Sequence, residues 1–261
     1  ELLATAPNQV WSWDITKLLG PVTWSYFYLY VILDIFSRYV VGWMLASAES
    51  ATLAQRLITD TCRKQQIAPG QLTLHADRGS SMTSKPVALL LADLGITKTH
   101  SRPYTSDDNP FSEAQFKTLK YRPDFPKRFG SLDEARAFCQ RFFTWYNGEH
   151  RHAGIGLMPP VAVHEGRADL MQTARHQVLM TAYAAHPERF VNKPPHPPVL
   201  PQAVWINPPT KESTAQNGVG TTIAIADDPR VAQHSEEIGV VAEIGGVTPY
   251  AITDPTDEVL H

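Results

Sequence analysis

The sequence has few of the residues that stabilise small secreted domains or anchor a chain in a membrane. Cys62 and Cys139 are its only cysteines, and neither has a Cys or His partner at metal-ligand spacing. This argues against a disulfide framework and against a structural zinc site. The longest apolar run, residues 26–33, is shorter than a bilayer requires, and no signal segment opens the chain. We therefore expect a cytoplasmic protein without a membrane partner.

The sequence also lacks the excess of positive charge that is typical of many nucleic-acid-binding proteins. Its formal net charge is −3 over 261 residues. Residues 213–261 contain eight acidic residues against one basic residue, so residues 1–212 carry a net charge of +4. A mildly basic body is compatible with a polyanionic partner, but charge alone does not indicate one.

Composition and patterning predict one large folded unit, followed by a proline-rich segment and an acidic tail. Hydrophobic residues make up 43% of the chain, which is enough for one substantial core. We expect the core to occupy residues 1–170 and a helical, proline-rich linker or small accessory module to occupy residues 171–212. Residues 213–261 are acidic and aperiodic, so we expect a disordered or loosely packed tail. Because the first residue is Glu and a strand pattern begins by Val10, we also suspect a fragment or a processed chain.

Hydrophobic periodicity predicts an α/β fold. Residues 10–18 alternate with a period of two, residues 26–34 form a continuous apolar strand, and residues 39–46 form a third strand after a short turn. A helix beginning after Ser50 and ending by Pro69-Gly70, a strand at 72–77 and a helix after Ser84 follow. A strand near residues 96–101, a helix after Asn109-Pro110 and a helix after Ser131 complete the order βββαβαβαα.

Three carboxylates occur at positions that can meet at one end of the predicted sheet. Asp14 lies in the first strand, Asp77 ends a later strand, and Glu113 lies in the first turns of a helix. Exactly 35 residues separate Asp77 from Glu113, and the flanking sequences are WSWDIT, HADRGSSMTS and SDDNPFSEAQFKTLKY. This pattern resembles the D,D(35)E signature of retroviral integrases and of integrase-like transposases from bacterial insertion sequences. The segment YNGEHRHAGIGLMPPVAV resembles the end of the same catalytic core.

The resemblance implies a fold and a chemistry. The fold is ribonuclease H-like, with a mixed five-stranded sheet flanked by helices, here followed by a proline-rich C-terminal extension. The implied activity is metal-dependent cleavage and strand transfer of DNA by a two-metal polynucleotidyl transferase. Asp14 would bridge two Mg²⁺ or Mn²⁺ ions, with Asp77 completing one site and Glu113 the other, because hard divalent ions prefer carboxylate oxygens.

Four further residues are candidates for DNA contact. Lys117 and Lys120 follow Glu113 at helical spacing and would share its face, although a Glu-Lys surface pair is the simpler interpretation. Asn109 could contact DNA, yet Asn before Pro is also a common helix start, and we favour the helix cap. Arg151 matches a position of the family motif and could be structural or contact DNA.

We expect structural roles for two other polar residues. Asp34 is a fourth candidate acid, which we interpret as a turn-capping residue, and His75 we interpret as packed and satisfied. An upstream helix-turn-helix is absent from the sequence, so we expect the chain to need a separate or upstream DNA-binding segment to choose element ends. By resemblance, a homo-multimer on element ends and target duplex at the bacterial nucleoid is implied. The alternatives are a degenerate remnant that only binds DNA or assembles with it, and a ribonuclease H-like nuclease.

Overall fold

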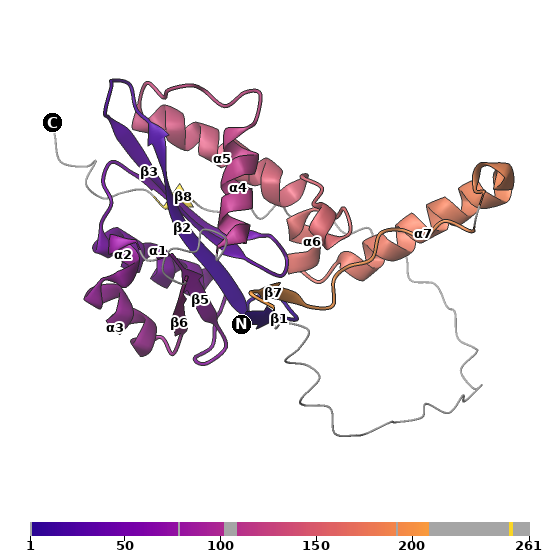
Figure 1. The fold of residues 1–261 in the computed structure, drawn as a ribbon, viewed down its shortest axis with the longest axis horizontal. Coiled ribbons are helices and arrows are strands. Elements are labelled where there is room, and N and C mark those ends of the chain that lie inside the picture. The colour runs from indigo at the N-terminus through magenta and orange to yellow at the C-terminus, as the bar shows by residue number, and fades with distance from the viewer. Residues whose placement is uncertain (1, 78, 102–108, 192, 209–250, 253–261) are drawn as a thin grey trace.

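The computed structural model describes most of the chain, and the fold is drawn in Figure 1. The described residues are 2–77, 79–101, 109–191, 193–208 and 251–252. Residues 106–108, which belong to the SDD part of the motif around Glu113, lie outside them. So does the expected acidic tail, apart from residues 251–252.

A central mixed sheet carries the fold. Its first three strands, β2 (Val10–Leu19), β3 (Tyr26–Asp34) and β4 (Val40–Ala46), form an antiparallel meander, in which β3 pairs with both β2 and β4. Strands β5 (Thr73–Ala76) and β6 (Thr97–His100) continue the sheet in parallel with β2, giving the order β6-β5-β2-β3-β4. Three antiparallel and two parallel strands in this arrangement confirm the expected ribonuclease H-like fold.

Helices cover both faces of this sheet (Figure 1). Helices α1 (Ala51–Lys64) and α3 (Lys85–Asp93) pack on one face, and the single turn α2 (Ser80–Thr83) lies between β5 and α3. Helices α4 (Pro110–Lys120) and α5 (Leu132–Gly148) pack on the other. The sheet therefore separates two hydrophobic clusters, and burial of both its faces explains the continuous apolar sequence of β3.

Alternation along β2 sends its side chains into different clusters. Trp11 and Trp13 point into the cluster formed with α1 and α3, whereas Leu18 packs with α4 and α5. Because side chains two residues apart share a face, Asp14 lies on the same side as Leu18. Asp14 therefore faces α4 rather than the tryptophan side, as the sequence pattern predicted.

Local signals set most of the helix boundaries. The side chain of Ser50 caps α1 by accepting a hydrogen bond from the backbone of the third residue of that helix. Ser131 caps α5 in the same way, and the Glu134 carboxylate reaches back to the Gly130 N–H. Helix α1 ends at Lys64, before Pro69-Gly70 as expected, and the chain then turns at Gln66 with a φ of 55°.

The C-terminal part of the described chain leaves the core and returns to it. After the 3-10 turn at Ala153–Ile155 and α6 (Pro160–His164), helix α7 (Ala168–Ala185) projects from the body in Figure 1. The chain turns at the 3-10 helix Pro187–Arg189 and runs back beside α7. The domain boundary expected after residue 170 falls inside α7.

Two short strands bring the ends of the described core together. Strand β7 (Val204–Ile206) pairs antiparallel with β1 (Leu2–Ala4), and Val204 and Ile206 are buried there. Strand β1 was not expected from the sequence. A two-residue strand, β8 (Ala251–Ile252), pairs with β4 and is a sixth strand of the sheet. None of the helices in the described ranges is long and apolar enough to cross a bilayer.

Candidate active site

The three carboxylates predicted from the sequence come from three neighbouring elements. Asp14 lies in the middle of β2, and Asp77 directly follows β5. The parallel register pairs Trp13 with Ala76, so the two aspartates follow adjacent positions of neighbouring strands. Glu113 lies in the first turn of α4, which packs on β2. The charges of Asp77 and Glu113 both act on Asp14, so the three side chains share one electrostatic environment.

Asp14 is the residue most affected by this environment. Its pKa is raised to about 7, first because burial removes the carboxylate from water and then because of the negative charges of Asp77 and Glu113. The Ile15 N–H, which donates a 2.7 Å hydrogen bond to Asp14 Oδ1, and the Lys120 ammonium lower this pKa in part. A partly buried carboxylate beside two others is therefore costly to ionise when no cation is bound.

Asp77 has a hydrogen-bond partner that sequence analysis missed. The Ser101 hydroxyl donates a 2.6 Å hydrogen bond to Asp77 Oδ1. Ser101 follows β6 as Asp77 follows β5, and these parallel strands are adjacent in the sheet. The order of the strands could have suggested this contact, since residues that follow neighbouring parallel strands meet at one edge. Ser101 therefore fixes one oxygen of Asp77.

The two predicted lysines of α4 differ in their surroundings. Lys120 Nζ donates a 2.7 Å hydrogen bond to Thr16 Oγ1, on the same face of β2 as Asp14. Partial burial lowers the pKa of Lys120, and the charge of Asp14 opposes that effect. Lys117 lies one turn earlier on α4 and is exposed. Both cations therefore extend from the carboxylates along one helix.

Asn109 lies at the expected start of α4, but its side chain does not cap the helix. It occupies the N-cap position of α4, but its side chain makes no capping hydrogen bond, and it is only 1% exposed. Instead its amide binds the Ser12 hydroxyl and, at 3.5 Å, the Trp13 carbonyl. The amide turns toward β2 and so does not bond to the helix backbone as a cap, while a contact of Asn109 with DNA stays a prediction.

Asp34 and His75 have the structural roles expected of them. The fully buried Asp34 carboxylate accepts hydrogen bonds from the Ser37 N–H and hydroxyl and from the Asn8 N–H, all between 2.7 and 2.8 Å. His75 is 3% exposed, and its Nδ1 lies 2.9 Å from Thr99 Oγ1. Both residues stabilise turns or strand contacts, as predicted.

The carboxylate oxygens of the site could bind divalent metal ions, with each ion held by two of the three acids. Within the described ranges, no three His, Cys, Asp or Glu side chains are arranged around a single point where they could hold one ion. The negative charges of Asp77 and Glu113 nevertheless raise the pKa of Asp14, and a divalent ion bound beside these carboxylates would offset that repulsion. The site therefore fits cation binding. The side chains present are hard oxygen ligands of the kind that Mg²⁺ prefers.

Comparison with protein families identifies the unit that holds these side chains. A family model described as integrase core domain matches residues 4–106, and a second model with the same description matches residues 94–160. Residues 4–160 of the chain are an integrase core domain. Together the two matches cover all three carboxylates, and they end before α7. The integrase core therefore comprises strands β2 to β6 with α1 to α5, and the projecting helix lies beyond it.

Curated relatives of this integrase core are transposases of bacterial insertion sequences. The chain is 34% identical over 158 residues to the transposase for insertion sequence element IS904 of Lactococcus lactis, covering 60% of this chain and 61% of that protein. It is 30% identical over 165 residues to the putative transposase for IS986/IS6110 of Mycobacterium tuberculosis, with 60% and 57% covered. The match thus spans less than two thirds of the length of these relatives.

Solved structures similar to the integrase core are more distant in sequence. The catalytic core domain of BIV integrase is 21% identical, with a TM-score of 0.44, and the match covers 63% of this chain and 98% of that one. The HTLV-2 integrase catalytic core domain in complex with magnesium is 15% identical, also with a TM-score of 0.44, and the match covers 61% and 97%.

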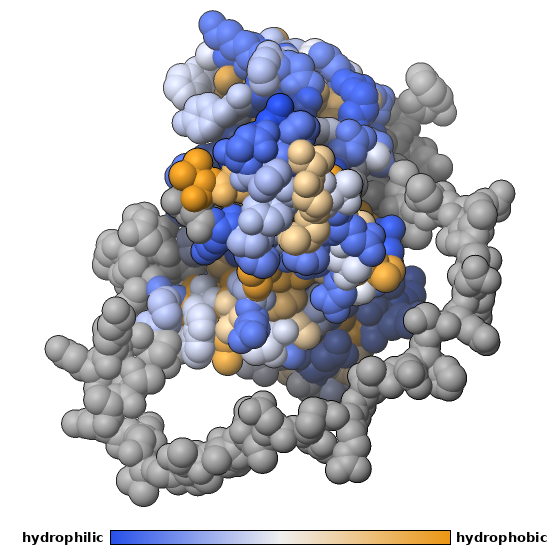
Figure 2. Space-filling view, turned by 90° about the vertical axis from the view of Figure 1, so that its right-hand side faces the viewer, coloured by the Kyte–Doolittle hydropathy of each residue, from blue (hydrophilic) through white to orange (hydrophobic). Residues whose placement is uncertain are grey.

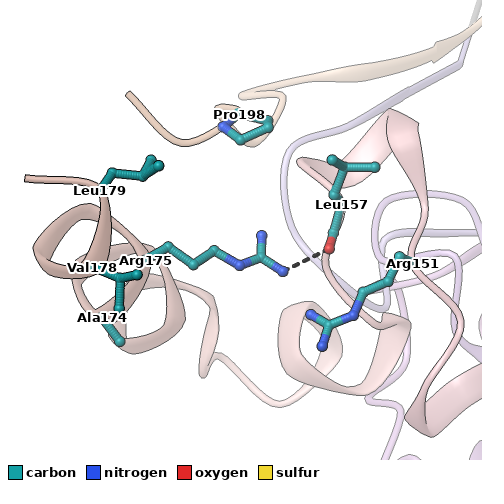
Figure 3. Close-up of a pocket in the computed structure, with 7 residues that line it drawn as sticks. All are labelled: Arg151, Leu157, Ala174, Arg175, Val178, Leu179 and Pro198. Atoms are coloured by element: carbon teal, nitrogen blue, oxygen red, sulfur yellow. Dashed lines mark hydrogen bonds between the residues drawn. The ribbon is translucent and has the colours of Figure 1, made fainter. Parts of the chain in front are cut away.

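Arg151 lies apart from the carboxylates of the integrase core, in an apolar pocket of about 600 Å³ beside α7 (Figure 3). The Arg175 guanidinium donates hydrogen bonds of 2.8 and 2.7 Å to the carbonyls of Gly156 and Leu157. Burial lowers the pKa of Arg175, and the positive charge of Arg151 lowers it further. The other lining residues are Ala174, Val178, Leu179 and Pro198. On the side toward which α7 projects, apolar surface is divided into separate patches among polar side chains (Figure 2).

Proposed function

We propose that this chain is the catalytic core of a bacterial insertion-sequence transposase, which cuts DNA at the element ends and joins them to a target duplex. The observation that carries the proposal is the shared environment of Asp14, Asp77 and Glu113 within an integrase core. The names of the curated relatives, which are transposases of insertion sequences, support the same conclusion.

The reaction exchanges one phosphodiester bond for another. In cleavage a water oxygen forms a bond to phosphorus while the bond to the 3′ oxygen breaks. In joining, the oxygen of the freed 3′ hydroxyl forms a bond to a target phosphorus while the bond from that phosphorus to the 3′ oxygen of the target strand breaks, and the proton of the attacking hydroxyl is lost to solvent. Two divalent ions, when bound, would stabilise the negative charge that builds on the phosphate and on the attacking and leaving oxygens. Asp14 and Asp77 would hold one ion, and Asp14 and Glu113 the other. No side chain of this chain becomes covalently attached to DNA.

Other residues of the site would orient the ligands and the substrate. Ser101, through its hydrogen bond to Asp77 Oδ1, would fix the orientation of that carboxylate. Lys120, held by Thr16, and the exposed Lys117 would contact phosphates along the DNA strand that enters the site. Contacts to phosphate position the DNA but do not read its sequence.

The partners follow from the proposed reaction. We propose that the chain acts as a multimer on paired DNA ends at the bacterial nucleoid, in the cytoplasm. An upstream or separate DNA-binding segment, such as a helix-turn-helix, would supply the choice of ends. Neither partner is derived from a residue described above, and both rest on the family.

A strand-transfer assay with terminal DNA and Mg²⁺ or Mn²⁺ tests the proposed activity. Asp14→Asn, Asp77→Asn and Glu113→Gln should each abolish cleavage and joining while leaving the circular dichroism spectrum unchanged. Asp34→Asn is unsuitable as a control because Asp34 is fully buried, whereas Asp93→Asn changes an exposed acid of α3 and should leave activity intact. Joining by a folded Glu113→Gln variant would remove Glu113 from the site.

The same assay separates the proposal from its two alternatives. A remnant that only binds DNA would shift labelled duplex in a gel but neither cut nor join it with any divalent ion. A ribonuclease H-like nuclease would cut RNA–DNA hybrid and release product without transferring strands. Either result with the wild-type chain would contradict the transposase assignment.

A further inference from the structure

A buried cluster of polar side chains joins α4 to β2 beside the candidate carboxylates. Ser12 is fully buried in β2, while Asn109 and Ser112, at the start of α4, are 1% and 2% exposed. The Ser12 hydroxyl donates a hydrogen bond to Asn109 Oδ1, and its oxygen also contacts the Ser112 hydroxyl. Because the single proton of Ser12 is used on Asn109, Ser12 accepts the proton of Ser112. Asn109 and Ser112, at the start of α4, therefore both form hydrogen bonds with the Ser12 hydroxyl of β2.

This cluster lies next to two of the carboxylates along the chain. Ser12 precedes Asp14 by two residues in β2 and so shares its face. Ser112 directly precedes Glu113 on α4. Asn109 Nδ2 donates a 3.5 Å hydrogen bond to the carbonyl of Trp13, which directly precedes Asp14. A short chain of hydrogen bonds therefore connects the backbone beside Asp14 with the backbone beside Glu113.

Apart from this cluster and the hydrogen bond of Lys120 to Thr16 at the C-terminal end of α4, large apolar side chains hold the helix on the sheet. Phe116 and Leu119 pack in the cluster that includes Leu18 and Val31. Apolar packing is not directional, so it holds the helix on the sheet without setting its position along the strand. Hydrogen bonds are directional, and a buried network whose members are satisfied is rigid. The polar cluster lies at the end of α4 that carries Glu113.

We propose that Ser12, Asn109 and Ser112 are positioning residues that set the separation of Glu113 from Asp14. The proposal rests on the proposed function, because it concerns how two carboxylates are held for divalent ions. Two ions that share Asp14 tolerate little change in the position of their other ligands, and residues that orient metal ligands contribute strongly to affinity. The cluster holds Glu113 in place through the backbone of α4.

Manganese binding to the full chain without DNA, measured by electron paramagnetic resonance, tests this role separately from activity. Ser12→Ala removes both contacts of the cluster and should weaken Mn²⁺ binding about 10- to 100-fold. Ser112→Ala leaves the bond between Ser12 and Asn109 and should weaken it less. The double variant should be no weaker than Ser12→Ala, because the two hydroxyls act through one contact.

Asn147→Ala is the matched control. Asn147 is also a buried asparagine that joins a helix to the sheet, since its amide binds the Val40 N–H at 2.9 Å and the Val40 carbonyl at 3.0 Å. It lies on α5, which carries none of the proposed ligands. Its replacement should lower the melting temperature, as that of Ser12 does, while Mn²⁺ affinity stays within about twofold of wild type.

The outcomes separate this inference from the function on which it rests. If Ser12→Ala and Ser112→Ala bind Mn²⁺ and join DNA like wild type, the positioning role is overturned and the transposase assignment stands. If Asn147→Ala loses Mn²⁺ affinity equally, the effect is general destabilisation and the positioning role is again overturned. If the wild-type chain neither binds Mn²⁺ nor joins DNA, the proposed function itself fails. Should Ser12→Ala not fold, Ser112→Ala alone decides between the first two outcomes.

Discussion

Lys120 Nζ donates a 2.7 Å hydrogen bond to Thr16 Oγ1, which lies two residues after Asp14 on the same face of β2. Lys120 and Asp14 are close enough for each charge to act on the pKa of the other. The hydroxyl that holds Lys120 is neutral and leaves the charge of the ammonium available. A cation is thus held beside the carboxylates and can also attract a phosphate.

Replacing Lys117 and Lys120 with Ala should weaken DNA binding similarly for element ends and scrambled duplex. Each lost phosphate contact should reduce the slope of log affinity against log salt by about 0.9 for duplex DNA. Competition binding at several salt concentrations measures both effects. Lys85→Ala, on the other side of the sheet, is the control and should change neither. An unchanged slope in the double variant would make the two lysines ordinary surface charges.

Asp14→Asn should stabilise the metal-free protein at pH 8 but hardly at pH 4. The pKa of Asp14 is raised from 3.8 to about 7 by burial, so between these pH values the folded state keeps a proton that the unfolded state has lost. Stability therefore falls as pH rises from about 4 to 7, and the Asn variant avoids this loss. The largest gain in stability expected of Asp14→Asn at pH 8 is about 4 kcal/mol, because each unit of pKa shift corresponds to about 1.4 kcal/mol.

Urea unfolding at both pH values measures this effect. Mg²⁺ at pH 8 should raise the melting temperature of the wild type more than that of Asp14→Asn, because the ion binds the folded carboxylate. The exposed Asp93→Asn variant is the control for a charge change without burial. Equal changes of stability at pH 4 and pH 8 would contradict a raised pKa of Asp14.

Gln115→Met should stabilise the protein. Gln115 lies on α4 with 1% exposure, and within the described part of the chain neither its amide nitrogen nor its amide oxygen has a hydrogen-bond partner. A buried amide without partners costs about 1–3 kcal/mol, which an apolar side chain of similar shape would remove. Urea unfolding should show a gain of that size. Gln65→Met, which removes a 2.9 Å contact with His164, should destabilise instead. A loss of stability in Gln115→Met would indicate an ordered water on the amide.

Truncation after residue 208 should change the melting temperature little, because we place residues 213–261 outside the catalytic unit. Truncation after residue 203 also removes β7, whose buried Val204 and Ile206 pack with β1, and should cost several kcal/mol. Limited proteolysis should remove the tail first. A large loss of stability in the longer truncation product would show that the pairing of Ala251–Ile252 with β4 contributes to the core.

Much of the fold could be predicted from local patterns. The alternation around Trp11 and Trp13 gave the strand and the direction of Asp14, and the caps Ser50 and Ser131 gave two helix starts. These signals depend on neighbours within a few residues, so they can be interpreted without the tertiary structure. The pairing of β1 with β7 could not be predicted, because its two strands are three residues each and about 200 residues apart in the sequence.

For the candidate site, too, some features could be predicted from the sequence and others could not. The sequence by itself determined which acids to consider, because the spacing of Asp77 and Glu113 and their flanking residues are properties of the chain. Only the tertiary structure decided what surrounds those acids. Ser101 reaches Asp77 because β5 and β6 are neighbours, and Asn109 turns inward because Ser12 presents a buried hydroxyl to it. Such contacts depend on the packing of elements that are distant in sequence, where hydrogen-bond partners are chosen by burial rather than by local spacing.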